Sequence, residues 1–171
     1  MININLVGGD RLRKALKAKG EALTKGVDVQ MQRSMAEINA NQKALAPVDF
    51  GLLRSSLKFT KIAPLEYEIV SSGPGSEYAP YQEFGTGSKV SIPKGLEREA
   101  AKYKGGKGGT FKDFLESMKD WCRKKGIPES AAYPMAIKII KNGIRPQPFF
   151  FAPAFKEFRE LKKRVQQLLG K

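Results

Sequence analysis

The sequence contains no histidine and only one cysteine, Cys122, among its 171 residues. Histidine is the commonest general base near neutral pH and the commonest transition-metal ligand, so its absence excludes Ser-His-Asp and Cys-His catalysis. A single cysteine excludes an intramolecular disulfide and any multi-cysteine zinc site. Cys122 follows Trp121 in an apolar pattern with helical spacing, which favours a buried thiol over a reactive one. We therefore expect no cofactor-binding residues and no catalytic or metal-binding site built on histidine or cysteine.

Nucleotide-binding motifs are also missing, although glycine is frequent near the middle of the chain. The Walker pattern needs Gly-Lys followed directly by Ser or Thr, but Lys107 is followed by Gly108. Gly85 and Gly87 do not complete a dinucleotide fingerprint, because Val90 stands where the third glycine is needed. Both nucleotide signals therefore fail on spacing.

One enzymatic hypothesis survives these exclusions, in which paired carboxylates hold a hard cation such as Mg²⁺. The candidate pairs are Glu66 with Glu68 and Glu77 with Glu83. Carboxylates that share one face of a strand are more often a solvated face than a metal site. The pattern therefore favours a protein that is not an enzyme.

Long hydrophobic runs are absent as well. No apolar run approaches the ~18 residues that span a bilayer, and the first residues carry no apolar signal core. We therefore expect synthesis in a cytoplasm and no membrane partner. The apolar fraction of 41% and the charged fraction of 28% are typical of a globular protein, so we predict a single domain over residues 1–171.

Positive charge is abundant. The chain carries 31 Lys and Arg against 17 Asp and Glu, a formal net charge of +14. Only residues 47–84 are acidic as a segment, with five acidic and three basic side chains. A strongly basic chain indicates contact with a polyanion, or docking onto acidic protein surfaces. A solvated, highly soluble surface is the alternative.

The N-terminal quarter has the apolar spacing of a helix. After Asp10, which can cap a helix, apolar residues recur at three- and four-residue steps or their sums as far as Leu45. We predict a long amphipathic helix, which spans ~50 Å if it is continuous. Gly20 and Gly26 favour an alternative with two shorter helices separated near these glycines.

Two stretches then alternate with the period of strands, 52–61 and 65–70. The short link at Pro64 predicts an antiparallel hairpin. The stretch 78–87 reads Tyr-Ala-Pro-Tyr-Gln-Glu-Phe-Gly-Thr-Gly and is expected to be a third strand or an edge segment, because Pro80 cannot donate to a central ladder. A strand places Tyr78 and Phe84 on one face and Tyr81 and Glu83 on the other. We expect one face to anchor the sheet and the other to meet a neighbour.

The second half begins with a Gly- and Lys-rich segment, 85–110, for which we predict a flexible loop. Two helices are expected as an insertion at about 110–143, the first starting with a capping-box pattern at Thr110. A final helix is expected to begin at Pro153. Its apolar stripe is predicted to lie in the core and comprises Phe151, Phe155, Phe158, Leu161, Val165 and Leu168.

Three motifs in this order carry a resemblance to a known family. The first is Ala46-Pro-Val-Asp-Phe-Gly-Leu-Leu-Arg-Ser-Ser-Leu57, the second is the stretch 78–87, and the third is Arg145-Pro-Gln-Pro-Phe-Phe-Phe-Ala-Pro-Ala154. With the preceding long helix they span nearly the whole chain. In these features the chain resembles the tail-completion proteins of long-tailed bacteriophages and prophages, also described as head–tail joining, neck or minor tail proteins.

The resemblance implies an α+β fold in which a long N-terminal helix and C-terminal helices pack on a small antiparallel sheet. It also implies a homo-oligomeric ring, usually hexameric, around the DNA channel between the head and the tail. The expected partners are other copies of the chain, head connector or stopper proteins, and tail tube or tail terminator proteins. The expected location is the virion neck, assembled in the bacterial host cytoplasm. The family offers no catalytic residue, cofactor or metal ligand to carry over.

The leading hypothesis is therefore a structural virion protein that completes the tail and joins it to the head connector. The alternative is a basic protein that binds nucleic acid without sequence specificity, and genome DNA in the channel could be contacted under either hypothesis. The sequence lacks a recognisable nucleic-acid-reading motif. The candidate interface residues are Tyr78, Tyr81, Glu83, Phe84, Arg145, Phe149 and Phe150.

Overall fold

A computed structural model of the chain describes residues 2–7, 14, 16–17, 19–48, 51–87, 91–101 and 110–170. Its helices and a small three-stranded antiparallel sheet form an α+β protein, as the sequence predicts. The chain divides into two compact units. Unit 1 comprises residues 1–79 and 148–171, and unit 2 comprises residues 80–147. The helical insertion expected at about 110–143 lies within unit 2.

Unit 1 is built around α2, a helix of 25 residues from Glu21 to Leu45. At 1.5 Å per residue α2 is ~37 Å long. Gly20 precedes it with a φ of 98°, which no α-helix contains, so the helical path is broken at this residue. Of the two sequence-based alternatives, the structure has the break, and Gly26 lies inside α2.

The sheet of unit 1 has the strand order β1-β3-β2, with β1 at Asn3–Val7, β2 at Leu57–Ala63 and β3 at Glu66–Ser71. The predicted β2–β3 hairpin is confirmed, and both outer strands pair antiparallel with β3. The strand predicted from residue 52 starts only at Leu57, because Leu52–Ser56 forms the short helix α3. The Ser55 and Ser56 hydroxyls donate to the carbonyls three residues earlier, which stabilises this local turn.

The prediction of a strand at 78–87 is wrong. Ser76–Tyr78 forms a 3₁₀ turn, η1, and Ala79–Phe84 forms the helix α4. Pro80 is the second residue of α4, where a missing N–H costs no hydrogen bond. The buried residues of α4 are 79, 80, 83 and 84, which is the spacing of one helical face and not the alternation of a strand. The third strand of the sheet is instead β1, from the N-terminal segment.

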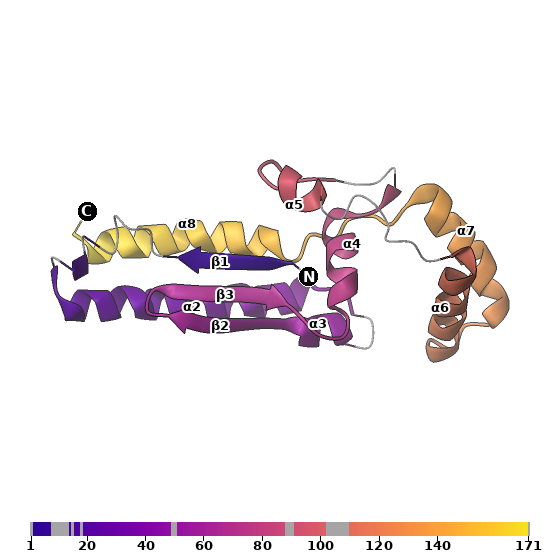
Figure 1. The fold of residues 1–171 in the computed structure, drawn as a ribbon, viewed down its shortest axis with the longest axis horizontal. Coiled ribbons are helices and arrows are strands. Elements are labelled where there is room, and N and C mark those ends of the chain that lie inside the picture. The colour runs from indigo at the N-terminus through magenta and orange to yellow at the C-terminus, as the bar shows by residue number, and fades with distance from the viewer. Residues whose placement is uncertain are drawn as a thin grey trace. The chain divides into compact units, whose positions relative to one another are not determined.

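The last helix, α8, runs from Phe151 to Leu168 and lies beside α2 (Figure 1). Helix α2 also packs against β2 and β3, so it is the element that joins the sheet to α8. Pro153 is the third residue of α8 and not the first. The predicted core stripe of this helix is only partly correct, since Phe155 is 43% and Leu168 41% exposed. The core of unit 1 includes Ile2, Val27, Met31, Met35, Ile38, Leu57, Tyr67, Ile69, Phe149, Phe150 and Leu161.

Unit 2 is helical wherever it has regular structure among its described residues. It contains α5 at Glu97–Ala101, α6 at Phe111–Lys124, the 3₁₀ turn η3 at Glu129–Ala131 and α7 at Ala132–Asn142. The predicted capping box is confirmed: the Thr110 hydroxyl accepts from the Asp113 N–H, and the Asp113 carboxylate accepts from the Thr110 N–H. Helix α5 lies within the segment predicted as a flexible loop, and the parts of that prediction at 88–90 and 102–109 lie outside the described residues.

None of the helices in the described part of the chain combines the length and the apolar character that crossing a membrane requires.

Candidate assembly surface

The second and third sequence motifs are held together in unit 2 by hydrogen bonds. The Thr86 N–H donates to the Ile144 carbonyl over 3.0 Å, and the Ile144 N–H donates to Thr86 Oγ1 over 2.8 Å. One turn away, the Gln147 N–H donates to the Gln82 carbonyl over 2.7 Å. Helix α4 and the extended segment 144–147 are therefore bound side by side, although some 60 residues separate them in sequence.

Glycine is required where these two segments approach most closely. Gly143 ends α7 with a φ of 69°, and a Cβ placed there would lie 1.9 Å from the Thr86 carbonyl oxygen. Real Cβ atoms do not approach a backbone oxygen so closely, and the left-handed backbone independently disfavours other residues. Gly143 therefore allows the backbone contact that joins the two motifs.

The C-terminal end of α2, which leads into the first motif, is bonded to the third motif within unit 1. The Gln42 side chain, which is fully buried, donates from Nε2 to the Phe150 carbonyl over 2.8 Å. Arg54 of α3 donates to the carbonyls of Ala46, over 3.2 Å, and Ala44, over 3.4 Å. These bonds satisfy carbonyls that the last turn of a helix leaves without an intrahelical partner. They also fix α3 beside the end of α2.

Four large apolar side chains are exposed on the elements that meet at this end of unit 1. They form what we call the end patch, and their exposed fractions are 57% for Leu45, 62% for Val48, 46% for Leu52 and 58% for Tyr78. Leu45 is the last residue of α2 and Leu52 the first of α3. Tyr78 belongs to η1, which follows Gly75, and a Cβ on Gly75 would lie 2.7 Å from the Leu52 carbonyl carbon. Exposed apolar residues gathered on contacting elements are typical of a docking surface.

The seven predicted interface residues divide by burial. Glu83, Phe84, Phe149 and Phe150 are at most 3% exposed, so their side chains belong to the interior of the chain. Tyr78 and Arg145 are exposed, and Tyr81 is partly buried. Phe149 and Phe150 contact each other edge to face, with ring centroids 6.2 Å apart. They support the fold beneath the surface, whereas Tyr78 is part of the end patch.

Sequence reasoning missed the other three members of the end patch. Leu45 follows the apolar spacing of α2, so it was expected to face the core, and Val48 and Leu52 lie in a segment interpreted as a turn and a strand. A signal was present, because apolar residues continue on both sides of Pro47 where a helix must end. Exposure could be assigned only once α3 was known to fold back against α2.

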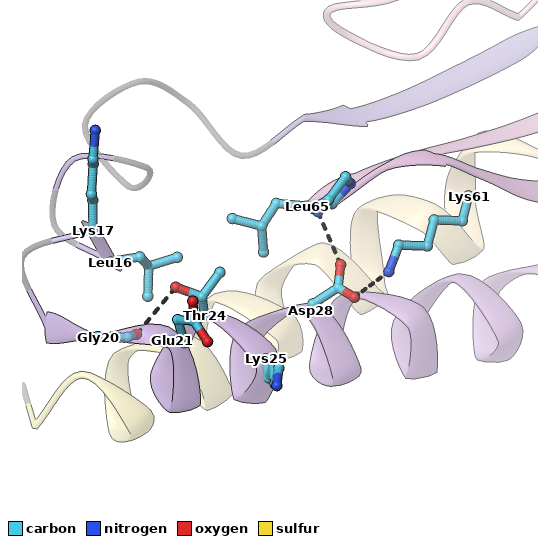
Figure 2. A pocket seen from close by; sticks show the side chains of 10 residues that line it. Leu16, Lys17, Gly20, Glu21, Thr24, Lys25, Asp28, Lys61 and Leu65 are labelled. Carbon is cyan, nitrogen blue, oxygen red and sulfur yellow. Dashed lines mark hydrogen bonds and ion pairs between the residues drawn. The ribbon is translucent and has the colours of Figure 1, made fainter.

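A separate groove of about 760 Å³ lies between the first turns of α2 and the β2–β3 turn (Figure 2). Figure 2 shows the Asp28 carboxylate of α2 pointing toward Lys61 and Leu65 of the hairpin. The carboxylate accepts from the Lys61 ammonium, from the Leu65 N–H over 2.9 Å, and from the Tyr67 hydroxyl over 3.1 Å. Burial raises the pKa of Asp28, but these three hydrogen bonds outweigh burial and hold the pKa below its ordinary value.

The role of Asp28 in this groove is structural. Leu65 has a φ of 60°, an unusual left-handed value for a residue with a side chain, and its N–H is the one that Asp28 accepts. Asp28 therefore fixes the tight turn of the hairpin to the helix beneath it. Its acceptor oxygens are already occupied by groups of the chain itself, and the described residues contain no cluster of acidic or cysteine side chains that could hold a metal ion.

A second buried polar contact joins α2 to α8. The Ser34 hydroxyl donates to Glu157 Oε1 over 2.9 Å, and Arg164 donates to both Ser34 Oγ and Glu157 Oε1. Ser34 is fully buried and Glu157 is 9% exposed. Because buried polar groups are costly unless they are paired, this contact fixes the register of the two helices.

Comparisons of the chain with protein-family models, with curated proteins and with solved structures find no match. The resemblance carried by the three motifs is therefore developed below as a proposal.

Proposed function

We propose that this chain is a structural subunit of a long-tailed bacteriophage or prophage, which completes the tail and joins it to the head connector as a homo-oligomeric ring. The observation that carries the proposal is the end patch. Its residues Val48 and Leu52 come from the first motif and Tyr78 from the second, so two of the three motifs supply exposed apolar side chains near the contact between α3 and η1. Apolar and aromatic side chains of this kind form the centre of stable protein–protein interfaces.

A ring places specific demands on such a surface. Neighbours in a ring meet head to tail, so the patch on one copy contacts a different surface on the next copy. Rigid support lowers the entropy lost on docking. The hydrogen bonds from Arg54 to the end of α2, and from Gln42 to the Phe150 carbonyl, provide that support beneath the patch. The buried residues of the motifs thus position the exposed ones.

The proposed neighbours along the tail axis are the head connector or stopper proteins on one side and tail tube or tail terminator proteins on the other. The proposed location is the virion neck, with assembly in the host cytoplasm. Binding of this kind requires complementary surfaces and no chemical step, in keeping with the sequence-based expectation that the protein is not an enzyme.

Electron microscopy of the full chain, alone and mixed with purified tail tubes, tests this proposal. We expect rings at high protein concentration, or rings that cap the ends of tubes. Leu45→Glu places a charge in the end patch and is expected to abolish the rings. Val29→Glu is the matched control, because Val29 lies on the same helix and is 58% exposed against 57% for Leu45. A protein that stays monomeric under every condition, with tubes included, contradicts the proposal.

The second candidate function is nonspecific binding to nucleic acid, which the net charge of +14 favours. Helix α8 exposes Lys156, Arg159 and Lys162 on the side away from the core, where they can reach phosphate groups. Titration with duplex DNA across a range of salt concentrations tests this candidate. Tight binding with a steep salt dependence, in a protein that forms no rings, replaces the first proposal. Absence of binding at physiological salt eliminates the second.

A further inference from the structure

The two edges of the sheet in unit 1 differ in how well they are protected from further strand pairing. The edge strand β2 carries Lys58 and Lys61, and its register with β3 shifts between Lys61 and Ala63. Charged side chains and bulges of this kind discourage another strand from pairing. Strand β1 reads Asn-Ile-Asn-Leu-Val, without a charge or a proline, and pairs with β3 in unbroken register. The edge at β1 is therefore the one suited to accept a further strand.

The register also shows which backbone groups of β1 point away from the sheet. The Ser71 N–H donates to the Ile2 carbonyl over 3.0 Å, so these two residues form a hydrogen-bonded pair of the antiparallel ladder. Such pairs alternate with pairs that exchange no hydrogen bonds. The N–H and carbonyl groups of Asn3, Asn5 and Val7 therefore face the outer edge. Among the described residues β1 pairs with β3 alone, so these groups are open to a further strand.

Helix α8 borders this edge on the side of the sheet where the helices pack. Helix α2 packs against β2, β3 and α8, and Figure 1 shows α8 on the β1 side of unit 1. Glu157 and Arg164 of α8 contact Ser34 of α2. Phe155 and Lys162 each stand two residues before one of these side chains, which is ~200° around a helix. Both therefore point away from α2, on the flank of α8 next to the edge of β1.

The side chains of this flank are basic and aromatic. It carries a stripe of exposed residues at three- and four-residue steps, which comprises Phe155, Arg159, Lys162 and Gln166. Neither Arg159 nor Lys162 forms a hydrogen bond or an ion pair with another described residue, whereas Glu160 of the same helix is bonded to Lys163. Two unpaired cations beside an open strand edge favour an anionic partner.

We propose that the edge of β1 binds an extended acidic segment of a partner protein, which adds to the sheet as a fourth strand. The backbone of the segment pairs with Asn3, Asn5 and Val7, and its side chains that face α8 are acidic and contact Arg159 and Lys162. Main-chain hydrogen bonds supply affinity in this kind of recognition, and alternate side chains supply specificity. A second copy of β1 is disfavoured, because it brings the same two cations of each α8 close together.

The first test uses two capped peptides as probes, one of alternating valine and glutamate and one of alternating valine and lysine. Each is titrated into the full chain. We expect the glutamate peptide to bind and the lysine peptide not to bind, and hydrogen exchange should slow at the Asn3 and Asn5 N–H groups in the complex. Failure of the glutamate peptide to bind, or equal binding of both peptides, overturns the proposal.

The second test removes one edge-facing donor. Asn5→Pro deletes an N–H that points away from β3, so the pairing of β1 with β3 is kept. We expect it to weaken binding of the glutamate peptide by about tenfold or more. Asn5→Ala is the matched control, because it loses the side chain and keeps the N–H. Circular dichroism and thermal melting establish that both variants are folded. Equal binding by the two variants contradicts strand addition.

The third test reverses one charge and leaves β1 unchanged. Lys162→Glu is expected to weaken binding of the glutamate peptide by about tenfold or more. Lys156→Glu changes the net charge equally and is the matched control, because Lys156 is exposed on the same helix but lies ~120° around it from Lys162. Equal weakening by both variants indicates general attraction between opposite charges and overturns the proposal.

Other occupants give different results. Duplex DNA that binds through Lys162, in a chain that does not bind the glutamate peptide, overturns the proposal. Dimers that Asn5→Pro abolishes also overturn it, because the occupant is then a second copy.

This site goes beyond the proposed ring and does not depend on it, because the edge of β1 contains no residue of the end patch. Leu45→Glu is expected to abolish the rings and to leave peptide binding intact. Rings without peptide binding refute this inference alone, and peptide binding without rings refutes the proposed function alone.

Discussion

The two units of this chain bury their apolar side chains to different degrees. The largest fully buried side chains include Tyr67, Phe149 and Phe150, and all but Glu83 of this set belong to unit 1. In the α6–α7 pair of unit 2 only a cysteine and two alanines are buried. The difference has a geometric cause. A long helix between a sheet and a second helix has neighbours on several sides, whereas each member of a helix pair has one.

This comparison indicates which unit contributes more to the stability of the fold. Unit 1 buries large apolar side chains, and its paired polar groups hold α2 in register with the hairpin and with α8. It also exposes the end patch. In the α6–α7 pair of unit 2, Phe111, Tyr133 and Ile140 remain 40%, 56% and 57% exposed. The pair therefore gains less from apolar burial than the core of unit 1 does.

The largest loss of stability is expected from replacing a buried methionine with alanine, and the same substitution can be made in each unit. Met35 of α2 is fully buried, whereas Met118 of α6 is partly exposed. We expect Met35→Ala to lower the free energy of unfolding by about 2–5 kcal/mol, from lost burial and the cavity left behind. Met118→Ala is expected to cost less than about 1 kcal/mol. Urea unfolding at a concentration where the chain is monomeric measures both. Equal costs would mean that the two environments do not differ.

The next effect compares a partly buried polar contact of unit 1 with an exposed ion pair of unit 2. Asp28→Ala removes the acceptor for Lys61, for the Leu65 N–H and for the Tyr67 hydroxyl. We expect a loss of about 1–3 kcal/mol, because a partly buried donor is left unpaired. Asp120→Ala in α6 breaks an ion pair whose two side chains are 58% and 56% exposed, and it is expected to cost less than about 1 kcal/mol. Thermal melting of the two variants compares them, and similar losses would argue against the structural role of Asp28.

A smaller effect is expected at the start of α6. Thr110→Ala removes one half of the capping box and is expected to destabilise α6 by about 1 kcal/mol. Hydrogen exchange should show faster exchange of α6 amides and unchanged exchange in α2. Ser117→Ala serves as control, because its hydroxyl donates only within the helix, to the Asp113 carbonyl. Equal acceleration in α2 would show that the two units unfold as one cooperative body.

The smallest effect is a pH dependence. The pKa of Asp28 is lowered in the folded state, so its ionised form stabilises the fold above the unfolded pKa of ~3.9. That contribution is lost as the pH falls through the lower folded-state pKa. The stability difference between wild type and Asp28→Asn should therefore be present at neutral pH and shrink in strong acid. A difference that stays constant across this range would contradict the role assigned to the charge.

The elements predicted correctly are those whose signal is local. The β2–β3 hairpin follows from period-two alternation and a proline turn, and α6 follows from the Thr110–Asp113 capping box. The stretch 78–84 was mistaken for a strand because aromatic residues favour strands and Pro80 suggests an edge. In the structure Pro80 lies in the first turn of α4, and β1 takes the place of the third strand. A five-residue strand at the N-terminus gives little local signal, because its pairing partner lies more than 60 residues away.

The sequence by itself determined the α+β class, the long helix, the hairpin and the helices of unit 2. Each of these features depends on residue types or on their spacing along the chain. Only the tertiary structure decided which apolar residues lie on the surface and which are buried. Leu45 and Phe150 are both apolar. Leu45 is the last residue of α2, and Phe150 directly precedes α8. Leu45 is 57% exposed, whereas Phe150 is fully buried beside Gln42 of α2, whose side chain donates to the Phe150 carbonyl. Exposure is a property of what packs against a residue, which no local pattern contains.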